Sequence, residues 1–175
     1  MSEKTNSAIP YILSVNGKEY QVIKLLGKGK GEYSYLVKNN DKSYVLKQIH
    51  HETCSYYQFG NKIEAEIHDY ERLKNSGIRI PLIVDVDIPN ERILKDYIKG
   101  ETVFDLIKND KIEERYLEQI KKMCVLLYAN NTNIDNYPTN FVVQDGLIFY
   151  IDYECNNYSD EWNFENWGIN YWPKT

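Results

Sequence analysis

The sequence predicts an α+β fold, in which a β-rich first half precedes a mostly helical second half. Up to about residue 98, short runs of alternating apolar and polar residues are separated by Gly, Pro and Asn, which is typical of strands and turns. After residue 100, apolar residues recur at the three-to-four-residue spacing of a helix face. The 175 residues, 42% of them hydrophobic, are enough for a compact domain with a core.

Three strands open the predicted sheet, after a loose arm over residues 1–10. Residues 18–26, "KEYQVIKLL", form the first strand. The segment "YSYLVKNNDKSYVLKQI" then divides into two strands around residues 39–41, because Asn and Asp tolerate the positive φ that tight turns require. The chain is therefore expected to begin as an antiparallel meander.

One amphipathic helix over residues 61–75 is predicted to follow. Ile63, Ile67 and Tyr70 recur at helical spacing with charged residues between them, and Gly77 is a suitable stop. The segments "IPLIVDVD" and "ERILKDYI" then read as two more strands joined across a Pro-Asn turn. The first half is thus predicted to be a five-stranded antiparallel sheet with one helix.

The second half is predicted to be small and helical, with one hairpin. Thr102 is a capping residue for a short helix that runs to Ile107, and a longer helix covers residues 111–128. Further on, "FVVQ" and "LIFYI" flank Asp145-Gly146, which is a strong signal for a two-residue hairpin turn.

Composition argues against several classes of protein. The net charge of −5, with both signs mixed along the chain, does not indicate a nucleic-acid-binding protein. No run of about 18 apolar residues predicts a membrane helix, and the polar N-terminus lacks the apolar core of a signal peptide. The three cysteines, Cys54, Cys124 and Cys155, form no zinc-binding pattern, so we expect reduced thiols in a cytoplasmic protein.

Three glycines at alternate positions, Gly27, Gly29 and Gly31, lie between two predicted strands. Such a turn lets backbone amides approach phosphate oxygens closely. A P-loop is excluded because no Ser or Thr follows the Gly-Lys pair, and a dinucleotide fingerprint is excluded because a strand follows instead of a helix. What remains is a glycine-rich hairpin, for which an ordinary turn is the alternative.

Two charged residues occur at unexpected places in these elements. Lys47 lies inside the apolar strand "YVLKQI", and alternation predicts that it points to the opposite face from Leu46. Glu66 lies on the amphipathic helix. The two form a functional pair if Lys47 is buried; the alternatives are a solvated sheet face for Lys47 and a surface carboxylate for Glu66.

Polar residues in the loop "NTNIDNYPTNF" suggest chemistry. Asp135 and Asn140 are brought close by a tight loop that Pro138 stiffens. Asp accepts a proton from a hydroxyl, and Asn offers an oxygen to Mg²⁺. Asp152 ends the strand "FYIDYE", in a position that suits a metal ligand, although an Asp that merely ends a strand is equally common.

The order and spacing of these residues resemble the protein-kinase-like superfamily. "LGKGKGEYSYLVK" resembles its glycine-rich loop, "YVLKQI" the strand with the ATP-binding lysine, and "EIHDYERL" the start of its regulatory helix. "ILKDYIKGET" is similar to the hinge, and "IDNYPTNF" with "YIDYE" to the catalytic and metal-binding segments. The resemblance covers residues 20–154 and implies one two-lobed domain, with an N-lobe over about residues 11–97 and a truncated C-lobe over residues 98–175.

The resemblance implies a binding site for ATP. The residues that would contact the nucleotide are Gly27, Gly29, Gly31, Val45, Lys47, Glu66, Asp96, Ile98 and Val142. The glycines would cover the phosphates, and Lys47 would hold the α- and β-phosphates with Glu66 as its ion-pair partner. Asp96 and Ile98 would offer backbone groups to adenine, between apolar walls formed by the two valines.

The resemblance also implies the catalytic and metal-binding residues. Asp135 would orient or deprotonate the accepting hydroxyl, and Asn140 and Asp152 would bind Mg²⁺, with Mn²⁺ as the alternative ion. Lys47 and Asn140 would take part in catalysis by aligning the phosphates and the metal, since phosphoryl transfer requires alignment and charge neutralisation.

Several positions depart from the family pattern. Glu32 stands where the third glycine of the loop is expected, so either its carboxylate points away from the phosphates or the loop is shifted by one residue. Asn133 replaces a supporting His, and "DYE" is more similar to the aminoglycoside and choline kinases than to protein kinases. Only 23 residues follow Asp152, which resembles the small atypical members: RIO-type kinases, the kinase of the KEOPS complex and the lipopolysaccharide sugar kinases.

The sequence therefore predicts an ATP- and Mg²⁺-dependent phosphotransferase, foremost an atypical Ser/Thr protein kinase. A kinase for a sugar, choline or aminoglycoside-like acceptor, and a catalytically weak nucleotide-binding regulatory module, are the alternatives. An unrelated α+β binding domain would place Lys47 and Asp152 far apart. The acceptor is expected to be a hydroxyl of a protein or small molecule, and neither a nucleic acid nor a membrane is expected as a partner.

The tail over residues 158–175 contains Trp162, Trp167 and Trp172. Aromatic residues of this size usually pack against a core, so the tail is expected to cover the small C-lobe. The alternative is a surface for a protein partner.

Overall fold

The computed structural model describes residues 11–29, 31–51 and 61–173. The predicted N-terminal arm and Cys54 lie outside the described residues. The chain groups into two compact units. Unit 1 comprises Met1–Ile63 and Leu82–Tyr97, and unit 2 comprises Glu64–Pro81 and Ile98–Thr175.

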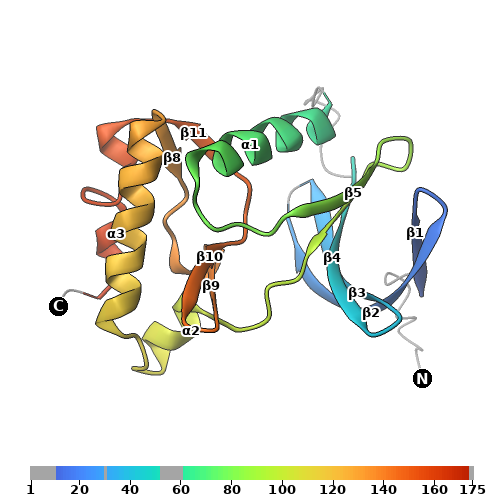
Figure 1. The fold of residues 1–175 in the computed structure, drawn as a ribbon, viewed down its shortest axis with the longest axis horizontal. Helices are drawn as coiled ribbons and strands as arrows, with labels where there is room; N and C mark the ends of the chain where they lie inside the picture. Colours follow the sequence, from blue (N-terminus) through green and yellow to red (C-terminus); the bar gives the residue numbers. More distant parts are fainter. Residues whose placement is uncertain (1–10, 30, 52–60, 174–175) are drawn as a thin grey trace, which may run out of the picture. The chain divides into compact units, whose positions relative to one another are not determined.

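Unit 1 is built on a six-stranded sheet whose neighbouring strands are all antiparallel (Figure 1). Its strands are β1 (Ile12–Val15), β2 (Lys18–Lys28), β3 (Glu32–Asn39), β4 (Lys42–Ile49), β5 (Ile83–Asp87) and β6 (Arg92–Asp96). They lie in the order β1-β2-β3-β4-β6-β5, so that β4 has a hydrogen-bonded neighbour on both sides. The predicted meander and the strand pair that ends the first half are confirmed.

The sheet has one strand more than predicted. β1 pairs with β2 through a tight turn at Asn16 and Gly17, whose φ angles of 49° and 83° place both in the left-handed region. Leu13 and Val15 are buried against the sheet core, which explains why this short segment is a strand. An Asn-Gly pair between apolar residues is a hairpin signal, and the five-strand prediction overlooked it.

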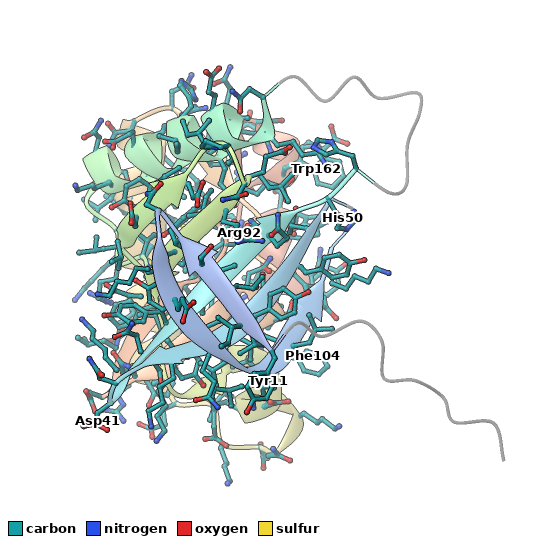
Figure 2. All side chains as sticks on the ribbon, turned by 90° about the vertical axis from the view of Figure 1, so that its right-hand side faces the viewer. Tyr11, Asp41, His50, Arg92, Phe104 and Trp162 are labelled. Atoms are coloured by element: carbon teal, nitrogen blue, oxygen red, sulfur yellow. The ribbon has the colours of Figure 1, made fainter. Side chains whose placement is uncertain are left out.

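The sheet curls so that its two edge strands approach each other. The backbone amide of Asn16 donates to Asp87 Oδ2 at 2.9 Å, and its side-chain amide donates to Asp85 Oδ1 at 2.8 Å. Arg92, labelled in Figure 2, donates from Nη1 to the carbonyl oxygen of Ser14 at 2.8 Å. The concave face encloses an apolar cluster formed by Leu13, Val15, Tyr20, Val22, Tyr35, Val37, Leu46 and Leu94.

Helices occur mainly in unit 2. They are α1 (Lys62–Ser76), α2 (Val103–Lys108) and α3 (Glu114–Ala129). α1 ends as predicted at Gly77, whose φ of 87° terminates the helix, and Thr102 Oγ1 caps α2 by accepting from the Asp105 amide at 3.1 Å.

The helix α3 begins three residues later than the predicted start at residue 111. The amide of Lys111 donates to the carbonyl oxygen of Leu106 at 2.7 Å, and Asp110 has a φ of 57°. Both features belong to the C-terminal closure of α2, so a new helix cannot begin at this point.

The strands of unit 2 form two small sheets. β7 (Glu101–Thr102), β9 (Phe141–Gln144) and β10 (Leu147–Tyr150) lie in the order β10-β9-β7, and β8 (Thr132–Ile134) pairs with β11 (Cys155–Asn157). Asp145 and Gly146, with φ angles of 51° and 78°, make the predicted turn between β9 and β10. Three 3-10 turns complete the unit: η1 (Pro138–Asn140), η2 (Asp160–Trp162) and η3 (Gly168–Asn170).

The predicted α+β class is confirmed, with a curled antiparallel sheet in unit 1 and a small hairpin among the helices of unit 2 (Figure 1). Within the described residues, none of the helices has both the length and the apolar character needed to span a bilayer.

Candidate functional site

The glycine-rich segment of unit 1 is the connection between β2 and β3. The Gly29 amide donates to the Glu32 carbonyl oxygen at 2.8 Å, and Gly27 pairs with Ser34 across the two strands. A side chain at Gly29 would meet the Glu32 carboxylate, and one at Gly31 would meet the Lys62 ammonium. Glycine is therefore suited to both positions, because side chains from the same unit already occupy the space beside the loop.

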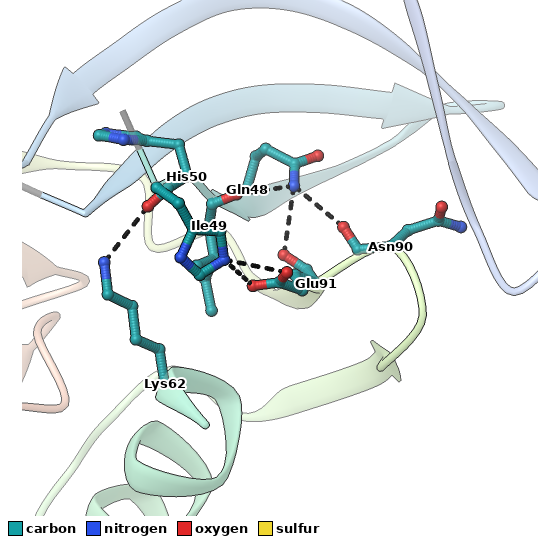
Figure 3. A network of polar contacts seen from close by, with 7 residues as sticks. Gln48, Ile49, His50, Lys62, Asn90 and Glu91 are labelled. Atoms are coloured by element: carbon teal, nitrogen blue, oxygen red, sulfur yellow. Dashed lines mark hydrogen bonds and ion pairs between the residues drawn. The ribbon is translucent and has the colours of Figure 1, made fainter. Parts of the chain in front are cut away.

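Several contacts fix the base of this loop, and Figure 3 shows the one between Lys62 and the carbonyl oxygen of His50. The backbone amide of His50 donates to the Gly31 carbonyl oxygen at 2.9 Å, and Lys62 Nζ donates to the His50 carbonyl oxygen at 3.3 Å. The His50 ring also lies 4.5 Å from that of Tyr33, between centroids. Strand β4 and the first residue of α1 thus hold one side of the glycine loop.

Lys47 occupies a buried position at the centre of the sheet. It lies on β4 opposite Ser34 of β3 and Ile93 of β6, and is only 8% exposed. Its neighbour Leu46 belongs to the apolar cluster on the concave face, so Lys47 points to the other face, as the alternation predicts. The alternative of a solvated sheet face does not hold, because the Lys47 side chain is buried. A buried side-chain amine requires polar partners.

One such partner is Glu32. The Lys47 Nζ and Glu32 Oε1 atoms lie 3.7 Å apart, and the Glu32 side chain is 38% exposed. Of the two expectations for Glu32, that its carboxylate points away or that the loop is shifted by one residue, the first does not hold, because the carboxylate faces Lys47. β3 places Glu32 two residues before Ser34 and hence on the same sheet face as Lys47, where the attraction between opposite charges orients its carboxylate inward.

Two other predicted nucleotide contacts also lie in unit 1. Val45 is buried on the same face of β4 as Lys47, in keeping with an apolar wall beside it. Asp96 ends β6, and its backbone amide donates to the Leu82 carbonyl oxygen at 2.9 Å. Because this amide already has a partner within the sheet, the proposed adenine contact of Asp96 would use its carbonyl oxygen.

In unit 2, the loop after β8 brings Asp135 and Asn140 together. Asp135 Oδ1 accepts from the Tyr137 amide at 3.1 Å, and the Asn140 side-chain amide donates to the Asp135 carbonyl oxygen at 3.2 Å. Pro138 is buried at the start of η1, where its ring restricts the backbone. With its Nδ2 group engaged, Asn140 retains its side-chain oxygen as a ligand atom.

Asp152 reaches the same part of unit 2 through β10. The amide of Ile151, next to Asp152, donates to the Asn140 carbonyl oxygen at 2.9 Å. Asp152 Oδ1 accepts from the Glu154 amide at 3.2 Å. The structure therefore brings the candidate base, Asp135, and both candidate metal ligands, Asn140 and Asp152, into one hydrogen-bonded segment.

Tyr150 connects the two parts of this segment, and the sequence reasoning missed it. Its hydroxyl donates to the Glu154 carbonyl oxygen at 2.7 Å and accepts from the Asp135 amide at 3.4 Å. Burial, with added repulsion from the Asp152 and Asp135 carboxylates, raises the pKa of Tyr150 well above its ordinary value. The hydroxyl thus stays protonated and acts as a permanent donor. The sequence did place Tyr150 two residues before Asp152 on the same predicted strand, and this position could have indicated that its side chain faces inward.

The donor set of this segment fits a hard cation. Among the described residues, no three His, Cys, Asp or Glu side chains gather to form a metal cage. Asn140 and Asp152 instead offer one amide oxygen and one carboxylate. Mg²⁺ is commonly held by one or two carboxylates together with substrate phosphates, so these two residues fit it.

The tail supports the loop from the other side. Trp172 is 3% exposed, packs against Phe141 and Phe164, and donates from Nε1 to the Asn136 carbonyl oxygen at 2.8 Å. Asn133, which stands where a His was expected, is buried and donates from Nδ2 to the Ser159 carbonyl oxygen at 2.9 Å. The tail therefore packs against the loop, as one of the two predictions for it states.

The remaining predicted residues belong to unit 2. Glu66 is half-buried on α1, and Ile98 is half-buried at the start of the segment that leads to β7. Val142 is buried on β9, where it pairs with Thr102 of β7. The roles expected for these three residues involve partners in unit 1, and they stay predictions.

Comparison with known proteins gives two related groups of relatives. A probable serine/threonine-protein kinase of Dictyostelium discoideum is 27% identical over 159 residues, which is 75% of this chain and 42% of the relative. A serine/threonine-protein kinase of Schizosaccharomyces pombe is 31% identical over 154 residues, 79% of this chain and 44% of the relative. The KEOPS complex subunit Bud32 of Pyrococcus abyssi is 27% identical over 92 residues, 51% of this chain and 42% of the relative.

No family model matches the chain. The chain spans less than half the length of these curated relatives. The α+β fold and the similarity to two kinds of kinase-like protein nevertheless both indicate a kinase-like protein. At this low identity, the chain is similar to members of the protein-kinase-like superfamily, and its fold is consistent with that superfamily.

Proposed function

We propose that this protein transfers the γ-phosphoryl group of ATP to a hydroxyl group, as an atypical Ser/Thr protein kinase. The observation that carries the proposal is the hydrogen-bonded segment of unit 2 that joins Asp135, Asn140 and Asp152. A base and two oxygen ligands for a cation are the groups that phosphoryl transfer requires. The names of the relatives support a Ser or Thr acceptor.

Unit 1 would supply the groups that hold the phosphates. Lys47 is buried, and its side-chain nitrogen would bind the α- and β-phosphates with Glu66 as its ion-pair partner. The glycine loop, with Gly27, Gly29 and Gly31, would cover the phosphates with backbone amides. Adenine would meet backbone groups of the hinge and the apolar side chains of two valines: Asp96, Ile98, Val45 and Val142.

Unit 2 would supply the groups that act on the acceptor. Asp135 would accept the hydrogen bond of the acceptor hydroxyl and align its oxygen with the γ-phosphorus. Asn140 and Asp152 would hold Mg²⁺ or Mn²⁺. When bound, the metal ion neutralises charge on the phosphate oxygens. Tyr150 would keep the Asp135 backbone in place by remaining a neutral hydrogen-bonding group.

Calorimetry with Mg-ATP tests nucleotide use. We expect wild-type protein to bind Mg-ATP and Asp152→Ala to bind it much more weakly in the presence of Mg²⁺. Glu118→Ala, which removes an exposed carboxylate from α3, is the matched control and should bind as wild type does. Absence of ATP binding to the wild-type protein would overturn the proposal. Transfer from radiolabelled ATP to a Ser-containing protein then tests the enzymatic step.

A second candidate function is a nucleotide-binding regulatory module with weak turnover. The ion pair between Glu32 and Lys47 favours it, because Glu32 competes with phosphates for the same ammonium group. If the protein has this second function, it should bind Mg-ATP without measurable phosphoryl transfer. The KEOPS subunit among the relatives supports a protein partner for such a module.

A further inference from the structure

A pocket of about 390 Å³ lies beside the candidate base in unit 2. Its eight lining residues are two carboxylates, three asparagines, two tryptophans and one isoleucine: Asp135, Glu154, Asn133, Asn156, Asn157, Trp162, Trp167 and Ile134. It is large enough for a long side chain together with part of a peptide backbone. We propose that it receives an Arg or Lys side chain of a protein acceptor and so selects Ser or Thr residues with a basic neighbour.

The charge of the pocket favours a cation. None of its eight lining residues is basic, and two of them, Asp135 and Glu154, are acidic. Arg72 approaches from α1, but it donates to Asn157 Oδ1 and to the Asn131 carbonyl oxygen at 2.8 Å each, and to Thr132 Oγ1 at 3.1 Å. Its charge is engaged with these groups, and Asp135 and Glu154 are the charged residues that line the pocket.

The two tryptophans provide aromatic walls. The ring centroids of Trp162 and Trp167 lie 6.0 Å apart, with an angle of 63° between the ring planes. Trp162 is 52% exposed, so its ring face remains accessible to a ligand. Guanidinium groups stack readily on indole faces, where the attraction between the cation and the ring adds to the charge attraction.

A buried polar atom on the pocket wall has no partner. Asn133 is 4% exposed, and its Oδ1 accepts no hydrogen bond from the described residues, although its Nδ2 donates to Ser159. A buried unpaired acceptor is costly, and because this oxygen has almost no exposed surface, a cationic N–H donor in the pocket would pair with it only if the Asn133 side chain turned toward the ligand. Asn156 and Asn157 add amide groups that match the N–H and C=O groups of a peptide backbone.

Asp135 also lines this pocket. The acceptor hydroxyl and the basic side chain would therefore lie within one small pocket, so the basic residue has to be close to the Ser or Thr in sequence. This inference rests on the proposed function for the role of Asp135. The binding of the basic side chain itself does not depend on phosphoryl transfer.

Binding of two labelled peptides to the full chain, without nucleotide, tests the proposal. One peptide carries Arg beside a Ser, and the other carries Gln in place of that Arg. We expect the Arg peptide to bind at least about tenfold more tightly, measured by fluorescence anisotropy. Trp162→Ala and Glu154→Gln should each remove most of this difference, whereas Glu118→Gln, on α3 and outside the pocket, should preserve it.

Equal affinity for the two peptides, or a preference that survives both pocket variants, would overturn the proposal. So would binding of neither peptide at millimolar concentration, or binding of glucosamine with Trp162-dependent affinity in place of the Arg peptide. The last result would indicate a small-molecule acceptor. A clear preference for the Arg peptide without any phosphorylation of its Ser would support the pocket and overturn the proposed kinase activity.

Discussion

The candidate residues of unit 1 and those of unit 2 are held in place in different ways. Lys47 lies on β4, which is hydrogen-bonded along both edges, so its position follows from strand register. Asp135 lies in a loop whose position depends on a few side chains, among them Tyr150, Asn140 and Trp172. The group held by backbone ladders should tolerate side-chain substitution, and the group held by side-chain contacts should not.

The largest effect is expected for the candidate base. Asp135→Asn keeps the shape of the side chain and the hydrogen bond from the Tyr137 amide, but removes the carboxylate. We expect phosphoryl transfer to fall by about 10² to 10⁴-fold, because a positioned base contributes on that order. Mg-ATP affinity should change little. Initial rates with radiolabelled ATP measure the first quantity and calorimetry the second. Asp110→Asn, an exposed turn residue, serves as control, and a fully active Asp135→Asn would contradict the assignment.

A pair of tryptophan variants tests whether side chains hold the loop of unit 2. Trp172→Ala removes a buried ring between Phe141 and Phe164, and should lower the free energy of unfolding by about 3–5 kcal/mol. Trp162→Ala removes a ring that is 52% exposed and should cost about 1 kcal/mol or less. Urea denaturation compares the two. Equal losses would show that Trp172 does not support the loop.

A smaller effect is expected for the ion pair in unit 1. Glu32→Gln removes the carboxylate 3.7 Å from Lys47 Nζ without disturbing the backbone ladder of β3. Because partly exposed ion pairs contribute about 0.2–1 kcal/mol, Mg-ATP should bind about 1.4- to 5-fold more tightly. Glu19→Gln, an exposed residue on β2, is the control. Weaker ATP binding by Glu32→Gln, measured by calorimetry, would show that Glu32 assists the nucleotide and does not compete with it.

The smallest effect concerns two buried thiols of unit 2. Burial raises the pKa of Cys124 and of Cys155 to about 12 each. Their folded pKa values exceed the ordinary thiol value of about 8.5. Their contribution to stability is therefore complete below about pH 8.5 and is lost as the pH rises toward 12.

Alkylation by iodoacetamide measures how well unit 2 encloses these thiols. In a Cys54→Ser variant, which leaves only Cys124 and Cys155, the reaction at pH 8 should be slow until denaturant is added. Rapid labelling of the folded variant would show that the packing of unit 2 is looser than its buried side chains indicate.

Local signals in the sequence predicted most of the elements. Thr102 at the start of α2, Gly77 at the end of α1 and the Asp145-Gly146 turn lie where expected, because their preferences act over a few residues. β1 was missed because four residues carry little periodicity, although Asn16-Gly17 marked its turn.

The contacts of the candidate site were only partly predictable. Alternation along β4 indicated the direction of Lys47, since neighbouring strand residues point to opposite faces. The same approach predicted the wrong direction for Glu32, because it considered repulsion from phosphates but not attraction to Lys47. Tyr150 was missed because its hydrogen bonds join residues that come close only when β10 folds against the loop.

The α+β class, the order of the main elements and the resemblance to the protein-kinase-like superfamily follow from the sequence alone. These properties depend on the periodicity of apolar residues, on turn residues and on the spacing of motifs, all of which can be read along the chain. The folded chain, by contrast, shows that Trp172 supports the loop while Trp162 and Trp167 line a pocket with Asp135. The composition of this short tail does not distinguish one tryptophan from another. Which of them is buried depends on the surfaces that the folded chain presents to each.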